Sequence, residues 1–271
     1  MKVVYNTQED PVQDIIFTDE QGWSYSSFDG ITFKGVYQPI FDRQNNIHAY
    51  EGLVRITDQN GDAVSPDDYL KPIRGDLKKL MLFFLITGKI HFQNFSRFYL
   101  PEQSIFINAP PCVFNTLGNS PGAIEQLLIR LQALGVPKEN VVYEIMEDNN
   151  TEMSLMAQGI ANLKEVDIRV ALDDFGSMGC DMARVRRHDV NIVKIDKAMV
   201  QNFVSTRSQI WEVLDYCQSR NITTIAEGIE TQEQLAIMKE WGVDYFQGYL
   251  LGKPIPAQNI LGVQSQQGSN E

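Results

Sequence analysis

The feature that most constrains the fold is a series of short apolar segments, each followed by a carboxylate, amide or ammonium side chain. These polar positions are Glu51, Asn108, Glu144, Asp173, Asp174, Lys194, Glu227 and Gln247. A charged group has no structural reason to end an apolar segment unless water or a metal ion meets it there. An α/β barrel builds its active site from polar side chains at the C-terminal ends of its strands. The pattern therefore predicts a barrel with its site at that end.

The chemistry of these side chains predicts a divalent metal ion. The acids and the amide offer hard oxygen donors, which Mg²⁺ and Mn²⁺ prefer. Asp173 and Asp174 are adjacent and repel each other unless a cation lies between them. Taken singly, each residue has an ordinary explanation: Asn108 can form a turn, and Lys194 can pair with an acid. Their joint placement at successive strand ends favours a metal site.

The order of the segments predicts a single barrel with one reversed strand. Segments 36–41 and 47–56 are joined by residues 42–46, a link too short for a crossover helix, so these strands are expected to be antiparallel. Further strands are expected at 104–108, 141–145, 169–173, 191–195, 223–226 and 245–247. Helical patterns are expected at 122–134, 151–164, 208–219 and 231–241. This alternation predicts a single (β/α)8 TIM-like barrel, of class α/β, with the first strand antiparallel.

Composition excludes several classes of function. The net charge of −12, without any basic run, argues against binding DNA or RNA polymers or an anionic membrane. No apolar run reaches the roughly 18 residues of a membrane span. The three cysteines form no CxxC pair, which argues against zinc and a disulfide framework and favours the reducing cytoplasm. The three histidines, at 48, 91 and 188, lack metal spacing and are expected to be surface or satisfied residues.

The motifs that carry these side chains resemble those of the EAL-domain family, bacterial phosphodiesterases of cyclic di-GMP. The matching motifs are Tyr37-Gln38-Pro39-Ile40, Glu51-Gly52-Leu53-Val54-Arg55, Ile107-Asn108, Glu144-Ile145-Met146-Glu147, Asp173-Asp174-Phe175-Gly176, Lys194-Ile195-Asp196, Ala226-Glu227-Gly228-Ile229-Glu230 and Gln247-Gly248-Tyr249. Gly52 replaces the family's alanine and Met146 replaces its threonine. The resemblance covers residues 34–260 as an EAL phosphodiesterase domain. Residues 1–33 are then expected to be an N-terminal extension packed on the barrel, and 261–271 a polar C-terminal tail.

The resemblance implies a two-metal site with Mg²⁺ or Mn²⁺. The ligands of the first metal would be Glu51, Asn108, Glu144 and Asp173. Asp173 would bridge to a second metal, together with Asp174. Glu227 would act either as general base or as a ligand of the second metal, and both roles stay open.

The resemblance also implies how water and substrate are held. Lys194 would position the nucleophilic water, and Glu147 would support the loop after Asp174. The residues expected to contact the substrate are Gln38, Leu53, Arg55 and Gln247, with Arg55 on a phosphate.

The implied function is metal-dependent hydrolysis of cyclic di-GMP to linear pGpG, which ends a bacterial second-messenger signal. One alternative is a catalytically weak receptor that only binds cyclic di-GMP. A protein-interaction module that binds no nucleotide is less favoured, because none of the acids is lost. A homodimer or a regulatory protein is a possible further partner, and the input signal is expected from the N-terminal extension, a partner or another part of a longer protein.

One loop departs from the family pattern. The family usually continues Asp-Asp-Phe-Gly with Thr-Gly-Tyr-Ser-Ser-Leu, whereas this chain has Ser-Met-Gly-Cys-Asp-Met at 177–182. Because methionine resists backbone conformations that glycine allows, the change at Met178 predicts slower assembly of the second metal site.

Overall fold

The computed structural model describes residues 12–146, 153–177 and 180–261 of the 271-residue chain. Its strands are β1 (Ile16–Thr18), β2 (Ser24–Phe28), β3 (Ile31–Phe41), β4 (Ile47–Thr57), β5 (Ala63–Val64), β6 (Ser104–Ala109), β7 (Val141–Ile145), β8 (Arg169–Phe175), β9 (Ile192–Ile195), β10 (Thr223–Ala226), β11 (Tyr245–Phe246) and β12 (Ile255–Pro256). Its α-helices are α1 (Pro66–Leu70), α2 (Leu77–Phe95), α3 (Pro111–Asn119), α4 (Pro121–Leu134), α5 (Met153–Glu165), α6 (Met182–Arg187), α7 (Lys197–Gln201), α8 (Phe203–Ser219) and α9 (Gln232–Glu240). Short 3₁₀ turns lie at Gln13–Ile15, Lys71–Ile73 and Lys138–Asn140.

Helix boundaries follow side chains that cap the free backbone amides. Asp76 accepts hydrogen bonds from the amides of Lys78 and Lys79 at the start of α2. Thr231 and Gln234 form a reciprocal capping box at the start of α9. Gly135 ends α4 in the left-handed conformation, with φ of 66°. Local sequence therefore sets where these helices begin and end.

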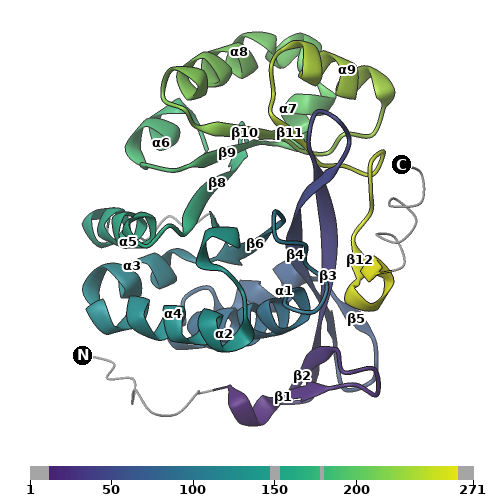
Figure 1. Cartoon of the computed structure of the whole chain (residues 1–271), viewed down its shortest axis with the longest axis vertical. Helices are drawn as coiled ribbons and strands as arrows, with labels where there is room; N and C mark the ends of the chain where they lie inside the picture. Colours follow the sequence, from purple (N-terminus) through teal and green to yellow (C-terminus); the bar gives the residue numbers. More distant parts are fainter. Residues whose placement is uncertain (1–11, 147–152, 178–179, 262–271) are drawn as a thin grey trace.

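Eight strands close into one barrel, as predicted. The hydrogen-bonded order is β3–β11–β10–β9–β8–β7–β6–β4, and β4 pairs with β3 to close the ring (Figure 1). β3 runs antiparallel to both β4 and β11, whereas β4 and β6 to β11 are parallel to one another. The reversed first strand and the TIM-like fold are thus confirmed.

The inside of the barrel contains an apolar layer and, above it, a polar layer. One buried side chain from each of seven strands forms the apolar layer, with Tyr245 of β11 packed against it: Ile40, Ala49, Phe106, Val142, Ala171, Ile192 and Ile225. Because alternate residues of a strand point to the same side, the next inward position lies two residues away. Those positions are Gln38, Glu51, Asn108, Glu144, Asp173, Lys194, Glu227 and Gln247. The strand period therefore places one polar side chain from each strand above the apolar layer.

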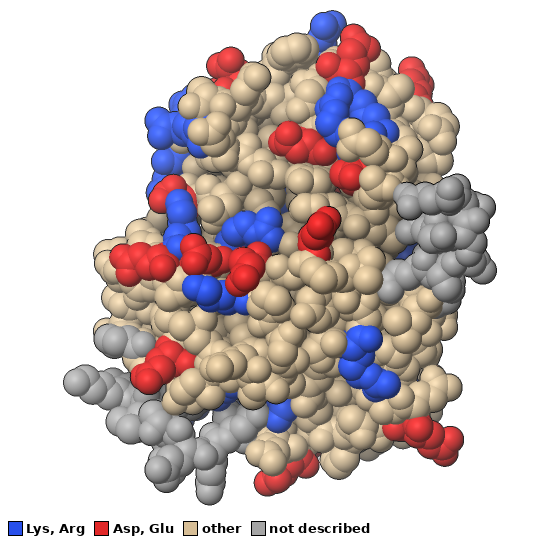
Figure 2. All heavy atoms as spheres, in the orientation of Figure 1, with Lys and Arg blue, Asp and Glu red and all other residues tan. Residues whose placement is uncertain are grey.

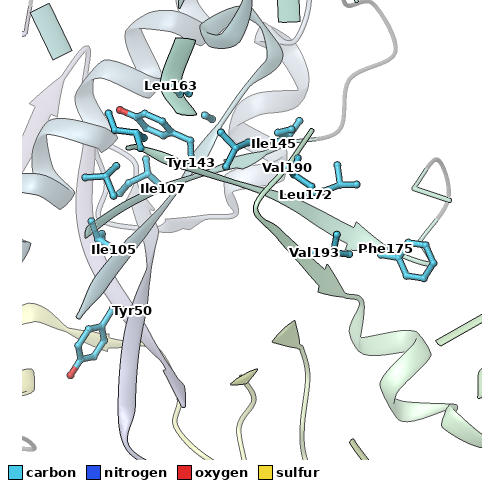
Figure 3. Close-up of a cluster of buried hydrophobic side chains, with 14 of the residues drawn as sticks. Tyr50, Ile105, Ile107, Tyr143, Ile145, Leu163, Leu172, Phe175, Val190 and Val193 are labelled. Carbon is cyan, nitrogen blue, oxygen red and sulfur yellow. The ribbon is translucent and has the colours of Figure 1, made fainter. Parts of the chain in front are cut away.

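The outward-facing strand residues pack against the surrounding helices. Tyr143 and Ile145 of β7 are fully buried on this outer side, together with Leu163 of α5 (Figure 3). The core continues around the barrel through β8 and β9, where Leu172 and Val193 are also fully buried. This tightly packed outer layer makes the strands a rigid support for the side chains inside.

An N-terminal hairpin extends the sheet beyond the barrel. β1 pairs with β2, and β2 pairs with β3, which begins five residues earlier than the segment expected from Val36. Asn94 of α2 accepts a hydrogen bond from the Ser24 amide at 2.7 Å and donates one to the Ser24 carbonyl at 3.1 Å. The two bonds fix α2 against the hairpin.

The surface mixes charges of both signs. On the face shown in Figure 2, Lys and Arg side chains lie interspersed with Asp and Glu rather than gathered in one area. Among the described residues, none of the helices has both the length and the apolar character needed to cross a lipid bilayer.

Candidate metal and substrate site

The polar layer gathers around one buried lysine. The Nζ atom of Lys194 lies 2.7 Å from Glu144 Oε1 and 2.7 Å from Glu227 Oε1. It also lies 3.2 Å from Asp173 Oδ1 and 3.6 Å from Glu51 Oε2. The side chain of Lys194 is 1% exposed, so these four carboxylates replace the water that an ammonium group normally binds.

Two amides orient the carboxylate of Glu51. Asn108 Nδ2 donates to Glu51 Oε1 at 3.2 Å, and Gln247 Nε2 donates to Glu51 Oε2 at 2.7 Å. The structure therefore brings together seven of the side chains that the sequence singles out, from β4, β6, β7, β8, β9 and the ends of β10 and β11. Each strand supplies one group, which explains why the positions are far apart in sequence.

Burial shifts the ionisation of the carboxyl groups in this cluster. Burial raises the pKa of Glu144 well above its usual value, and Lys194 offsets only part of that rise. Burial likewise raises the pKa of Glu227 to about 8, again against the opposing effect of Lys194. Burial alone would lower the pKa of Lys194, yet Asp173, Glu144, Glu227 and Glu51 together hold it well above its usual value. Lys194 is therefore charged at any physiological pH.

The charge and the donor atoms of the cluster fit divalent cations. Four carboxyl groups surround a single ammonium group, so their full ionisation leaves an excess of negative charge in a buried place that a divalent cation can neutralise. Asp173, Asp174 and Glu227 each offer a carboxylate oxygen, and these oxygens all lie within 4.8 Å of one another. Oxygen donors of this kind suit a hard divalent cation better than a softer metal.

The backbone at Asp174 is unusual and turns its carboxylate toward this group. Asp174 has a φ of 58°, in the left-handed region that non-glycine residues seldom adopt. Its amide donates to Asp173 Oδ1 at 3.0 Å, and its carbonyl accepts from the Ser177 amide at 3.0 Å. Strain of this kind persists where the surrounding structure holds it, often at functional sites. Met178 and Gly179, where the loop departs from the family pattern, lie outside the described residues, as does Glu147.

Three of the four expected substrate residues lie on the same side of the β3–β4 hairpin. Leu53 and Arg55 follow Glu51 at alternate positions of β4, and Arg55 is exposed. Gln38 lies on β3 directly opposite Glu51 and donates through Nε2 to the Gly252 carbonyl at 3.1 Å. Gln38 belongs to the polar layer, and Leu53 and Arg55 extend from it along β4. Gln247, the fourth expected substrate residue, joins the cluster through its bond to Glu51.

The register reveals a residue that sequence reasoning missed. Lys34 of β3 is the direct partner of Arg55 on β4 and is also exposed. Directly opposed like charges destabilise an antiparallel pair unless an anion lies between them. No motif marks Lys34, and only the pairing of the two strands could have identified it.

The expectation that all three histidines are surface or satisfied residues was wrong for His188, whose side chain is 7% exposed and whose Nδ1 atom has no hydrogen-bond partner among the described residues, and for His91. The side chain of His91 is 3% exposed, and its Nδ1 atom likewise has no hydrogen-bond partner among the described residues. The ring lies against β3 and β4, edge-on to Tyr37 with ring centroids 5.4 Å apart. Helical spacing could not have revealed this contact, because it depends on glycines in β3 and β4, outside the helix that carries His91.

A separate hollow of about 590 Å³ lies between the N-terminal hairpin and α2. Phe17, Tyr25 and Lys89 are among its lining residues, and none of the polar-layer side chains reaches it. The convergence of ionisable groups, rather than the size of a cavity, therefore locates the candidate site.

Comparison with known proteins identifies a family. Residues 26–254 match the EAL domain, which is more than half of the chain. A protein named cyclic di-GMP phosphodiesterase PdeF, from Escherichia coli K12, is 28% identical over 230 residues. The aligned region is 83% of this chain and 30% of that protein, so the chain spans about a third of that relative's length.

Solved structures agree with the fold. An EAL domain protein from Listeria monocytogenes EGD-e matches with a TM-score of 0.71 at 25% identity, covering 86% of this chain and 92% of the other. A standalone EAL protein from Vibrio cholerae O395, in a cyclic di-GMP-bound form, matches with a TM-score of 0.68 at 25% identity, covering 85% of this chain and 95% of the other.

Proposed function

Because the chain belongs to the EAL domain family, we propose that it is a metal-dependent phosphodiesterase that hydrolyses cyclic di-GMP to linear pGpG. The observation that carries the proposal is the cluster of four carboxylates around the buried Lys194, with two amides fixing Glu51. A catalytically weak receptor would have no need to hold so much unbalanced negative charge in place. The family relatives named above support the substrate.

We propose that the cluster holds two Mg²⁺ or Mn²⁺ ions. Glu51, Asn108, Glu144 and Asp173 would hold the first ion, and Asp173 would reach the second together with Asp174. When bound, the ions supply Lewis acidity, which activates water and stabilises charge on the phosphate. The grouping of Glu227 with Asp173 and Asp174 supports a ligand role for Glu227 at the second ion.

The protein's own residues position the reactants. Lys194 would orient the attacking water, since its ammonium is the sole cation at the centre of the described cluster. If Glu227 is instead the general base, its raised pKa suits it to accept the proton from that water near neutral pH. Arg55 and Lys34 would bind a phosphate from opposite strands, while Leu53, Gln38 and Gln247 line the remainder of the substrate site.

We assign this activity to residues 34–260, with residues 1–33 as an extension on the barrel and 261–271 as a tail. The pairing of β1 with β2, and of β2 with β3, supports a packed extension. We place the protein in the cytoplasm, because Cys180 and Cys217 are buried reduced thiols, as expected in a reducing compartment. The expected regulatory partner is a second copy of the chain or a separate protein.

Product analysis tests the proposal against the receptor alternative. The chain is mixed with cyclic di-GMP and Mn²⁺, binding is measured by calorimetry at short times, and products are separated by chromatography. Appearance of pGpG in the wild type, and its loss in Glu227→Gln, is the expected result. Tight binding without any pGpG would favour the receptor, and absence of binding would favour a protein-interaction module.

A further inference from the structure

The strand that carries Glu51 has a glycine at the very next position, where the resembling motif has alanine. Gly52 points outward, away from the polar layer, because neighbouring residues of a strand face opposite sides. A Cβ atom at Gly52 would lie 2.9 Å from both Cγ and Nδ1 of His91, and 3.1 Å from Cδ2. These atoms belong to a rigid ring, so the methyl group of alanine does not fit without movement of the strand or the ring.

A second glycine completes the space around the ring. A Cβ atom at Gly35 of β3 would lie 2.8 Å from the Tyr37 hydroxyl and 3.3 Å from His91 Nδ1. The ring of His91 therefore fills a slot on the outer face of the β3–β4 pair. The slot is bounded by Gly35, Gly52 and Tyr37. Burial lowers the pKa of His91 to about 3, so the group in this slot is a neutral ring and its contact is one of shape.

The slot adjoins the most constrained carboxylate of the site. Glu51 is tied on both oxygens by Asn108 and Gln247, so a shift of its backbone disturbs both hydrogen bonds. His91 comes from α2. Two hydrogen bonds between Asn94 and Ser24 hold this helix against the N-terminal hairpin of β1 and β2. A clash in the slot therefore acts directly between the His91 ring and the β4 backbone beside Glu51.

We propose that His91 is a positioning residue: its ring, seated in the slot left by Gly35 and Gly52, sets the depth at which β4 holds Glu51 in the metal site. The inference rests on the proposed role of Glu51 as a metal ligand. It assigns a function to a histidine that touches neither metal nor substrate, and it gives a reason for glycine at position 52.

A double-mutant cycle tests the inference, with Mn²⁺ affinity measured by electron paramagnetic resonance without substrate. Gly52→Ala should weaken Mn²⁺ binding by about tenfold or more, as supporting residues around metal ligands do. His91→Ala should cause a smaller loss. The double variant Gly52→Ala/His91→Ala should bind Mn²⁺ more tightly than Gly52→Ala alone. Gly88→Ala is the matched control, because a Cβ at this α2 position meets nothing within 4 Å and should leave the affinity unchanged.

The outcomes separate the inference from the proposed function. Wild-type affinity in Gly52→Ala, or a double variant no better than Gly52→Ala, would overturn the positioning role, even if the thermal midpoints shift. If Gly52→Ala does not fold, folding and Mn²⁺ binding are measured in the double variant instead. A double variant that folds and binds Mn²⁺ supports the inference, and an unfolded double variant overturns it. A wild-type protein that does not bind Mn²⁺ would contradict the proposed function and remove the inference with it.

Discussion

Replacing Lys194 with methionine removes the ammonium group from four carboxylates while keeping a long apolar side chain. Two of its contacts are 2.7 Å long, and a pair of unit charges at that distance attracts by about 6 kcal/mol at an effective dielectric constant of 20. Much of this attraction offsets the cost of burying the ions, so the net loss on removing one partner is smaller. We expect Lys194→Met to lower the free energy of unfolding by about 3–5 kcal/mol at pH 8 in chelator.

The loss should depend on pH in a defined direction. Burial raises the pKa of Glu227 from 4.5 to about 8 and raises that of Glu144 as well. A carboxyl group with a raised folded pKa favours folding below its unfolded value, and that stability is lost as the pH rises through the folded value. At pH 5 Glu227 is protonated, and Glu144, whose pKa is raised as well, carries less charge than at pH 8. Both groups then attract Lys194 less, so the variant should lose less stability at pH 5 than at pH 8.

Urea unfolding followed by tryptophan fluorescence measures this difference, at pH 5 and pH 8, in chelator and in saturating Mg²⁺. Lys138→Met is the matched control, because Lys138 pairs with Asp167 at 3.0 Å on the surface and should contribute only about 0–1 kcal/mol. Mg²⁺ should stabilise Lys194→Met more than the wild type, since the variant has more unbalanced negative charge. A Lys194→Met loss no larger than that of Lys138→Met would refute the electrostatic reasoning.

Three further predictions concern turnover. Glu51→Gln and Asp173→Asn should each lower turnover of cyclic di-GMP by about a hundredfold or more, because each removes a charged metal ligand. Circular dichroism should show an unchanged fold, and full activity in either variant would contradict the ligand assignment. Arg55→Ala and Lys34→Ala should mainly raise KM, because each removes a phosphate contact rather than a group that activates water; a collapse of kcat with unchanged KM would argue against that role. Changing residues 178–180 from Met-Gly-Cys to Gly-Tyr-Ser should speed turnover at saturating Mg²⁺, because glycine allows backbone conformations near Asp174 that methionine resists. A rate no higher than that of the wild type would contradict this explanation of the loop.

The sequence predicted the barrel because its signals are local. Residues 42–46 are too few for a crossover helix, which forces the antiparallel pair, and the alternation of strands and helices then requires parallel pairing. The polar layer was predictable for a related reason. Each polar side chain follows an apolar segment, and the period of two in a strand puts all of them on the inner side.

Other features depend on contacts that the sequence does not encode locally. The charge pair of Lys34 and Arg55 appears only when the register of β3 and β4 is known. The burial of His91 depends on two glycines in different strands and on the docking of α2. The N-terminal hairpin was not expected, because β1 and β2 are short and only the pairing of β1 with β2 and of β2 with β3 defines them as strands.

The rate of pGpG formation from cyclic di-GMP, measured as Mn²⁺ is titrated into chelator-treated protein, tests the proposed metal site most directly. We expect no turnover in chelator, recovery of turnover as Mn²⁺ is added, and binding of two Mn²⁺ ions per chain at saturation. Equal rates in chelator and in saturating Mn²⁺ would contradict the proposal that the carboxylates around Lys194 form a catalytic metal site.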